Sequence, residues 1–440
     1  MSELNLIKAA EFALEYAKNQ GIDQSEVSLH QGTGVSITAR QQELETVEKH
    51  NDAQFVISVY KDSKTGSASS ADMSEQGIRS TVDAAASIAR YTGSDKCFGL
   101  ADAELMASQE QDLDIHHAWN ADEAQMLDLA VRCEQAAVES SDRITNSEGA
   151  SVNSYSGSAV YANSHGFLGQ SLGSQYSISC SVIGSNDDSM QRDYWYDSSR
   201  DAAKLDSPED IGVEAAKRTI ARLGARQIDS CQAPVMYDSG AAKSLISHLV
   251  GALKGGAIYK KASFMLDKIG EDVLPNFVTI AENPHRLGAS GSAWHDGEGV
   301  ATPKYRAIVD SGCLKSYVLG SYTARKLGLQ STANAGGVRN LSISNTGQTS
   351  EQLLREMGTG LLVTELIGSG INMVTGDYSR GAAGFWIENG EIQYPVEEIT
   401  VAGNLVDMYR NIVAIGDDYD NRGSTECGSI VIENMTIAGS

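Results

Sequence analysis

The stretch Val363–Glu391 restricts the fold most, because it combines many glycines with a strong hairpin signal. Its glycines are Gly368, Gly370, Gly376, Gly381, Gly384 and Gly390. Phe385–Ile387 and Ile392–Tyr394 read as short strands, and Asn389-Gly390 lies between them. A type I′ turn needs positive φ at both central residues, which this pair tolerates best. The sequence therefore predicts a β-hairpin here.

The residues before that hairpin are predicted to form a loop bounded by Gly376 and Gly381. The loop carries an acid, a phenol, a hydroxyl and a guanidinium. A loop held by flanking strands is a common place for binding residues. The alternative is that the acid and the guanidinium, Asp377 and Arg380, only pair across a turn.

Length and charge limit the classes of function. A chain of 440 residues is expected to form two domains with full-sized cores. A net charge of −24 argues against binding nucleic acid or anionic lipid, because both need a basic face. No apolar run is long enough to span a membrane.

The cysteines and the first residues point to a cytoplasmic protein. The six cysteines are scattered without a CxxC pair, which fits reduced thiols better than zinc ribbons or disulfides. The start, Met1–Leu6, has no basic segment followed by an apolar core, so we expect no signal peptide.

The fold class predicted for the whole chain is α+β with two domains. Residues 1–228 are expected to form a mixed domain of helices and antiparallel strands, with a sub-boundary in the acidic connection 94–119. Strands are predicted by alternation and helices by apolar stripes and caps. The expected strands lie at Val27–Leu29, Val35–Ala39, Phe55–Val59 and within Val152–Val182, and the expected helices at 3–19, from Asp72 to Tyr91, from Asn120 to Ser140, and from Pro208 to Leu223.

Residues 229–440 are expected to form a mostly antiparallel, barrel-like β domain. A strand at Val235–Tyr237 precedes an amphipathic helix at Ser239–Leu253, which Gly255-Gly256 should end. After residue 270 the pattern is strand and turn, with a single helix at about Thr349–Met357.

The usual catalytic motifs are absent or weak. No histidine is followed by glutamate, which excludes the zinc-peptidase motifs HExxH and HExxxH. His285 and His295 are predicted to lie at the surface, and His248 at the rim of its helix. Gly169–Gly173 matches GxSxG but lies among strands, without the strand-to-helix elbow that the chemistry needs.

Two acidic clusters are predicted to be solvated loops. One consists of Asp187, Asp188, Asp193 and Asp197 around Tyr194–Tyr196, and the other is Asp417–Asp420. The adjacent aromatic residues mark either a contact surface or a fold-back onto the core. The role of the whole 187–201 segment stays open.

The stretch Gly376–Gly390 resembles the signature of the TldD/PmbA family (peptidase U62, "modulator of DNA gyrase"). Three later segments fit the same family: Met408–Ile412, Ile415–Asp418, and Cys427–Ile430 with Met435–Gly439. The resemblance is closest to the PmbA (TldE) branch. It implies a cytoplasmic protease in which a TldD-type subunit holds zinc on an HExxxH helix and a distant cysteine. That subunit pairs with a PmbA-type subunit around a cavity that admits unfolded peptides.

The residues that depart from that pattern imply that this chain is the non-catalytic subunit. Alignment with the family puts Ile246, Ser247 and Gly251 at the positions of the HExxxH residues, and Cys427 at the cysteine ligand. We therefore expect no cofactor in this chain and zinc in its partner. The chain would shape the cavity and hold extended peptide by strand addition. The expected contact residues are Gly376, Asp377, Tyr378, Ser379, Arg380, Gly381 and Gly384.

The alternative is an autonomous homodimeric hydrolase with a non-standard metal or hydroxyl site. Such a site would need Cys427, His248 and a carboxylate from Asp267 or Glu271. The sequence leaves open which peptides are substrates and whether the chain associates with itself.

Overall fold

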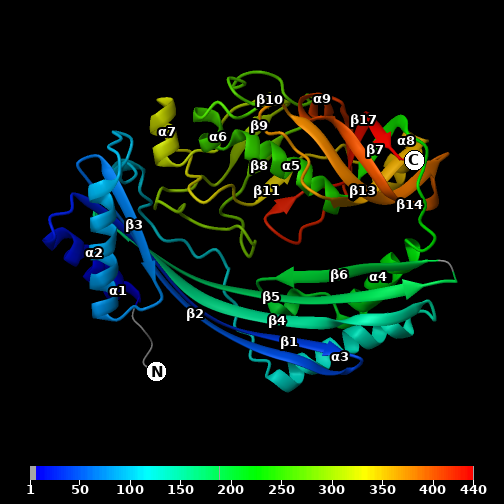
Figure 1. Ribbon diagram of the computed structural model, residues 1–440, viewed down its shortest axis with the longest axis horizontal. Coiled ribbons are helices and arrows are strands. Elements are labelled where there is room, and N and C mark those ends of the chain that lie inside the picture. The colour runs from blue at the N-terminus through cyan, green and yellow to red at the C-terminus, as the bar shows by residue number, and fades with distance from the viewer. Residues whose placement is uncertain (1–5, 188, 440) are drawn as a thin grey trace.

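The computed structural model describes residues 6–187 and 189–439 of the chain. A long curved sheet with four helices forms the N-terminal part, and a β-barrel with a small second sheet forms the C-terminal part (Figure 1). The predicted α+β class, with antiparallel strands first and a barrel afterwards, is confirmed. Residues 3–5 of the first predicted helix and Asp188 of the first acidic cluster lie outside the described residues.

The N-terminal sheet has six antiparallel strands in the order β3-β2-β1-β4-β5-β6. Its strands are β1 (Gln24–Arg40), β2 (Glu43–Lys61), β3 (Lys64–Ser70), β4 (Ile144–Asn163), β5 (Leu168–Ser185) and β6 (Met190–Ser199). The two short strands predicted around Val27 and Val35 are one strand. Gly32 and Gly34 between them make no turn: a Cβ at Gly32 would overlap the ring of Tyr155 on the neighbouring strand.

Four helices cover one face of this sheet in two pairs. They are α1 (Leu6–Asn19), α2 (Glu75–Tyr91), α3 (Glu123–Glu139) and α4 (Pro208–Ala221). Residues of α1 and α2 share one apolar core with the sheet, and residues of α3 and α4 share another. The predicted caps of α2 and α3 were wrong by two residues. Ser74 and Asp122 cap these helices, because their side chains accept from backbone N–H groups in the first turn. The predicted cap at Ser207, with Pro208 at the first helical position, is confirmed.

One edge of the sheet is open over much of its length. β3 pairs only with the Phe55–Lys61 end of β2. No described strand pairs with the outer side of Glu43–Gln54, and the residues of that segment are all exposed.

The C-terminal barrel is a closed ring of five strands. They are β7 (Cys231–Tyr237), β12 (Gly360–Ile367), β13 (Asp377–Glu388), β14 (Glu391–Asn404) and β17 (Ile430–Ala438). The ring runs β14-β13-β12-β7-β17 and closes where Thr400–Ala402 pair with Thr436–Ala438. The predicted hairpin turn is confirmed, since Asn389 has φ 54° and Gly390 has φ 75°.

The remaining elements surround this barrel. Strand β15 (Ile412–Ile415) pairs antiparallel with β17. A separate sheet consists of β8 (Ile280–Glu282), β9 (Arg306–Asp310), β10 (Cys313–Leu314), β11 (Leu341–Ile343) and β16 (Thr425–Glu426). The helices are α5 (Ser239–Leu253), α6 (Gly255–Tyr259), α7 (Ser321–Leu327), α8 (Ser350–Met357) and α9 (Leu405–Arg410). α5 agrees with its prediction, but Gly255 begins α6, and α7 and α9 were not predicted. No helix of the described residues is long and apolar enough to cross a membrane.

A clamp around Arg422 joins the two parts. Its guanidinium lies 3.8 Å from the ring centroid of Trp195 and 4.6 Å from that of Tyr196, and it donates to the Tyr196 carbonyl at 2.9 Å. Asp420 binds this guanidinium and also Lys243 of α5, at 2.9 Å. The Tyr194–Tyr196 aromatics therefore lie in strand β6, not in the solvated loop that was predicted. Asp420 of the second acidic cluster is not solvated either, because it binds Arg422 and Lys243.

Candidate functional site

The three residues expected at zinc-binding positions, Ile246, Ser247 and Gly251, all lie on α5, and their side chains do not fit a zinc ion. The Ile246 side chain is 3% exposed and packs in the core. Ser247 is exposed and donates its hydroxyl to the Lys243 carbonyl at 2.9 Å. A Cβ at Gly251 would lie 3.3 Å from the terminal methyl of Met373. Zinc needs histidine, cysteinate or carboxylate ligands, and these three positions provide none.

Cys427 is not prepared as a ligand either. Its thiol is buried and donates to the Gly428 carbonyl at 3.2 Å. Burial raises the pKa of Cys427 to about 12, so the thiolate that a metal requires is disfavoured at neutral pH.

The ligand set of the alternative hydrolase is not assembled. Nowhere in residues 6–187 and 189–439 do three histidine, cysteine, aspartate or glutamate side chains gather as a metal site. The His248 ring meets Tyr378 edge-on with a centroid separation of 6.2 Å, and burial lowers the pKa of His248. Glu271 forms an ion pair with Lys268 instead. The grouping with Cys427 was therefore wrong.

The residues after Gly376 form the first part of strand β13, and the prediction of a loop over Gly376–Gly381 was wrong. From Asp377 onward the strand pairs with β14 on one side. On its other side, Ser379 N–H donates to the Gly370 carbonyl at 2.8 Å, and residues 381–387 pair with β12. A Cβ at Gly384 would overlap the Leu362 carbonyl of β12. This backbone therefore has no free edge on which a peptide strand could pair.

The alternative prediction, in which Asp377 and Arg380 pair across a turn, is also wrong. Asp377 and Arg380 form no ion pair with each other. Asp377 accepts from the Thr375 hydroxyl at 2.6 Å, and Arg380 donates to the Leu366 carbonyl at 3.3 Å. Tyr378 is buried, whereas Asp377 and Ser379 are exposed.

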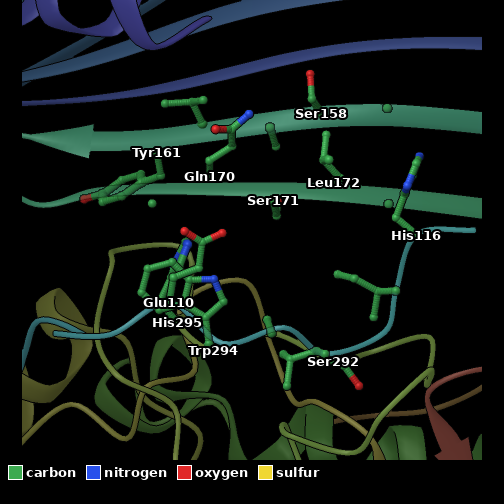
Figure 2. A pocket seen from close by; sticks show the side chains of 18 of the residues that line it. Glu110, His116, Ser158, Tyr161, Gln170, Ser171, Leu172, Ser292, Trp294 and His295 are labelled. Atoms are coloured by element: carbon green, nitrogen blue, oxygen red, sulfur yellow. The ribbon is translucent and has the colours of Figure 1, made fainter.

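A cavity of about 900 Å³ with polar and aromatic lining lies between the N-terminal sheet and C-terminal loops. Strands β4 and β5 form its floor, and the segments 110–116 and 292–297 form its other walls (Figure 2). The cavity falls in the size range of ligand pockets.

The floor is flat because small residues occupy the positions that face the loops. Gly157 pairs with Gly173 and Ala159 with Ser171 across β4 and β5. Figure 2 shows Ser171 directed toward the loops, with Gln170 and Leu172 directed to the opposite side. The GxSxG match therefore forms part of the cavity floor and lies within the continuous strand β5. It has no strand-to-helix elbow, the feature on which its catalytic interpretation depended. Alternating small residues on two neighbouring strands were the signal that could have revealed this floor.

His295 faces this floor, and its prediction as a surface residue was wrong. Its ring packs against Tyr161, Phe167 and Trp294. Nδ1 lies 2.6 Å from the Asp296 carbonyl, which can only accept, so Nδ1 carries the proton and Nε2 is an acceptor. A Cβ at Gly169 would lie 2.7 Å from that Nε2. Burial lowers the pKa of His295, which favours the neutral ring.

The described residues show no hydrogen bond between His295 and Ser171. A serine nucleophile needs its base within hydrogen-bonding reach and an exposed elbow between strand and helix. The cavity therefore has the features of a binding site: a flat floor, aromatic walls and a few polar groups.

Comparison with known proteins agrees with this architecture. Residues 25–89, 116–223 and 230–439 match the family models of PmbA/TldA metallopeptidase domain 1, central domain and C-terminal domain. The chain is 48% identical to "Metalloprotease PmbA" of Escherichia coli O157:H7, covering 99% of this chain and 96% of that protein.

Two solved structures share the fold. A Bacteroides thetaiotaomicron protein named for modulation of DNA gyrase is 28% identical, with a TM-score of 0.94 and complete coverage of both chains. TldE from Thermococcus kodakarensis is 19% identical, with a TM-score of 0.82, over 98% of this chain and 100% of that one. The sequence match over nearly its whole length shows that this chain belongs to the PmbA/TldD metallopeptidase family.

Proposed function

We propose that this chain is the non-catalytic, PmbA/TldE-type subunit of a two-subunit cytoplasmic metalloprotease that degrades or processes unfolded peptides. One observation carries the proposal: the α5 residues that we expect at the family's zinc-binding positions, Ile246, Ser247 and Gly251, offer no metal ligand. Ile246 has a hydrocarbon side chain in the core, the Ser247 hydroxyl donates to a carbonyl of its own helix, and Gly251 has no side chain.

The residues at these three positions determine which subunit would carry out hydrolysis. Ile246, Ser247 and Gly251 supply neither a zinc ligand nor a carboxylate base, and the single histidine of this part of α5, His248, has no second ligand beside it. A TldD-type partner with HExxxH would therefore hold the zinc and carry out hydrolysis. This chain would provide peptide-binding surface. In favour of that role, the cavity has a floor of small residues, which allows an extended chain to lie close to the sheet.

The test is cleavage of an unfolded protein such as casein by the purified chain, by a TldD-type subunit, and by both together. We expect cleavage to require the TldD-type subunit, to increase when this chain is added, and to stop with a zinc chelator. Chelator-sensitive cleavage by this chain alone would instead support the autonomous hydrolase. Cleavage by the TldD-type subunit that is indifferent to this chain would contradict the partner role.

A pair of variants tests the cavity as the peptide contact. Ser171→Phe places a ring above the floor and should reduce the stimulation of cleavage. Leu168→Phe is the matched control, because Leu168 is an exposed residue of the same strand β5 and does not line the cavity. Equal stimulation by both variants would argue against peptide binding in the cavity.

The Gly376–Gly384 segment stays a secondary proposal, limited to its side chains. Asp377 and Ser379 are exposed beside a fully paired backbone. If Asp377→Ala and Arg380→Ala leave both peptide binding and assembly with the partner unchanged, this segment is not a contact.

A further inference from the structure

An arginine with unused hydrogen-bonding capacity lies in the wall of the cavity. Arg339 lines the cavity and is half-buried, and its Nε is buried without a hydrogen-bond partner. No carboxylate of the described residues forms an ion pair with its guanidinium. A buried donor without an acceptor is unfavourable. An unpaired guanidinium in a cavity wall is a suitable place for a ligand that supplies an anion.

The carboxylates nearest to Arg339 already serve other donors. Asp296 accepts from the backbone N–H groups of Glu298, Val300 and Ala335, at 2.9, 3.0 and 3.0 Å. Glu282 binds the side chain of Arg306 and accepts from the backbone of Arg339 itself. These two acids favour the charged form of Arg339 electrostatically, but neither accepts a hydrogen bond from its side chain.

A second arginine lines the same cavity. Arg200 donates its terminal nitrogens to the carbonyls of Ser174 and Ser290, at 3.2 and 2.6 Å, and its Nε is buried without a partner. The neutral His295 contributes an acceptor at Nε2. The interior of the cavity therefore offers guanidinium donors, one imidazole acceptor and the aromatic surface of Trp294.

The segment on the other side of the cavity has the opposite charge. Glu110, Asp112 and Asp114 line the cavity and are exposed. Two backbone bonds hold this segment in place: Ser174 N–H to the Ile115 carbonyl at 3.0 Å and Gly288 N–H to the Leu113 carbonyl at 2.8 Å. A ligand that spans the cavity would meet positive groups in one wall and negative groups in another.

We propose that the cavity binds the carboxylate-bearing end of a peptide, with the carboxylate on Arg339 and the chain lying across the floor of small residues. Cationic groups elsewhere on the peptide face Glu110–Asp114. The proposal rests on the proposed function, since it names the peptide chemistry that this subunit recognises. Guanidinium groups suit carboxylates because their planar donors match both oxygens.

The experiment is calorimetric titration of the full chain with the hexapeptide Lys-Gly-Ala-Gly-Ala-Ala as free acid and as C-terminal amide. We expect amidation to weaken binding about tenfold or more, as loss of a charge-assisted bond would. A third peptide, amidated but with glutamate as its last residue, separates an α-carboxylate from a side-chain carboxylate. Tight binding of this third peptide also supports carboxylate recognition and assigns it to the side chain. Equal binding of free acid, amide and glutamate peptide overturns the proposal.

Variants locate the carboxylate. Arg339→Gln should bind the free acid as weakly as the wild-type chain binds the amide, with no further loss for the amide. Arg143→Gln is the control, because Arg143 is exposed and is not among the residues that line the cavity. A wild-type preference for the free acid that survives in Arg339→Gln would overturn the assignment to Arg339.

These outcomes are separable from those of the proposed function. Equal binding of acid and amide with intact partner-dependent cleavage contradicts only the carboxylate site. Clear discrimination between acid and amide, with no effect of this chain on the TldD-type subunit, contradicts only the partner role.

Discussion

Replacing Arg422 with alanine should loosen the connection between the two parts of the molecule. The Arg422 side chain is 15% exposed and its partner Asp420 is 7% exposed. The substitution removes the contacts with the rings of Trp195 and Tyr196, the bond to the Tyr196 carbonyl, and one of the two cations on Asp420.

The expected loss is about 3–5 kcal/mol in the free energy of unfolding. Each desolvated cation–π contact contributes about 0.5–2 kcal/mol. Removing one partner of a buried ion pair costs about 3–5 kcal/mol when the other charge is stranded. Lys243 still neutralises Asp420 at 2.9 Å, so these contributions do not add fully. With an unfolding entropy of about 2.1 cal/mol/K per residue, a chain of 440 residues should lose about 3–5 °C in melting temperature.

The measurement is thermal and urea unfolding followed by circular dichroism and tryptophan fluorescence. Arg192→Ala is the matched control, since Arg192 lies on the same strand β6 in an exposed pair with Glu148 at 3.1 Å. Such surface pairs contribute about 0–1 kcal/mol. If Arg422→Ala changes stability no more than Arg192→Ala does, the clamp is not what holds β6 to the C-terminal part.

Three further predictions follow from buried groups. Cys427 should react with a thiol reagent such as DTNB only on unfolding, because it is buried and burial raises its pKa to about 12. Cys231 and Cys313 are only half-buried, so the test uses a chain in which both are replaced by serine, and fast labelling of Cys427 in that folded chain would contradict the prediction. Gly384→Ala should destabilise the barrel by about 2 kcal/mol or more, measured by urea unfolding, since its Cβ overlaps the Leu362 carbonyl; a neutral effect would show that β12 and β13 can separate. Burial raises the pKa of Asp296 to about 6, so the folded state holds this proton more tightly than the unfolded state does. The contribution of Asp296 to stability therefore falls as the pH rises from about 4 to about 6, and Asp296→Asn should gain stability relative to wild type over that range; a difference in unfolding free energy that is independent of pH would refute this.

The features that follow from local rules were predictable from the sequence. The Asn389-Gly390 turn needed only positive φ at two residues. The bounds of α5 followed from a long apolar stripe, because a helix of that length repeats its pattern several times. α7 and α9 are too short to show such a repeat.

The features that depend on distant contacts were missed. Gly32 and Gly34 resemble a turn in sequence, and only the position of Tyr155 on β4 explains them as part of a strand. His295 becomes a cavity residue only when its loop packs against Gly169 of β5. That Ile246, Ser247 and Gly251 offer no zinc ligand was visible in the residues themselves, whereas the packing of Met373 over Gly251 required the structure.

Because β2 has an open edge, the N-terminal sheet can accept a further strand, whereas the C-terminal barrel cannot. The barrel is a closed ring, so a new strand could enter it only by breaking an existing ladder. At Glu43–Gln54, by contrast, a further strand can be added without removing any hydrogen bond. The acidic side chains of Glu43, Glu45, Glu48 and Asp52 oppose uncontrolled pairing of two copies there. Insertions that lengthen the N-terminal sheet are therefore best tolerated at this edge, both for engineered fusions and for divergence within the family.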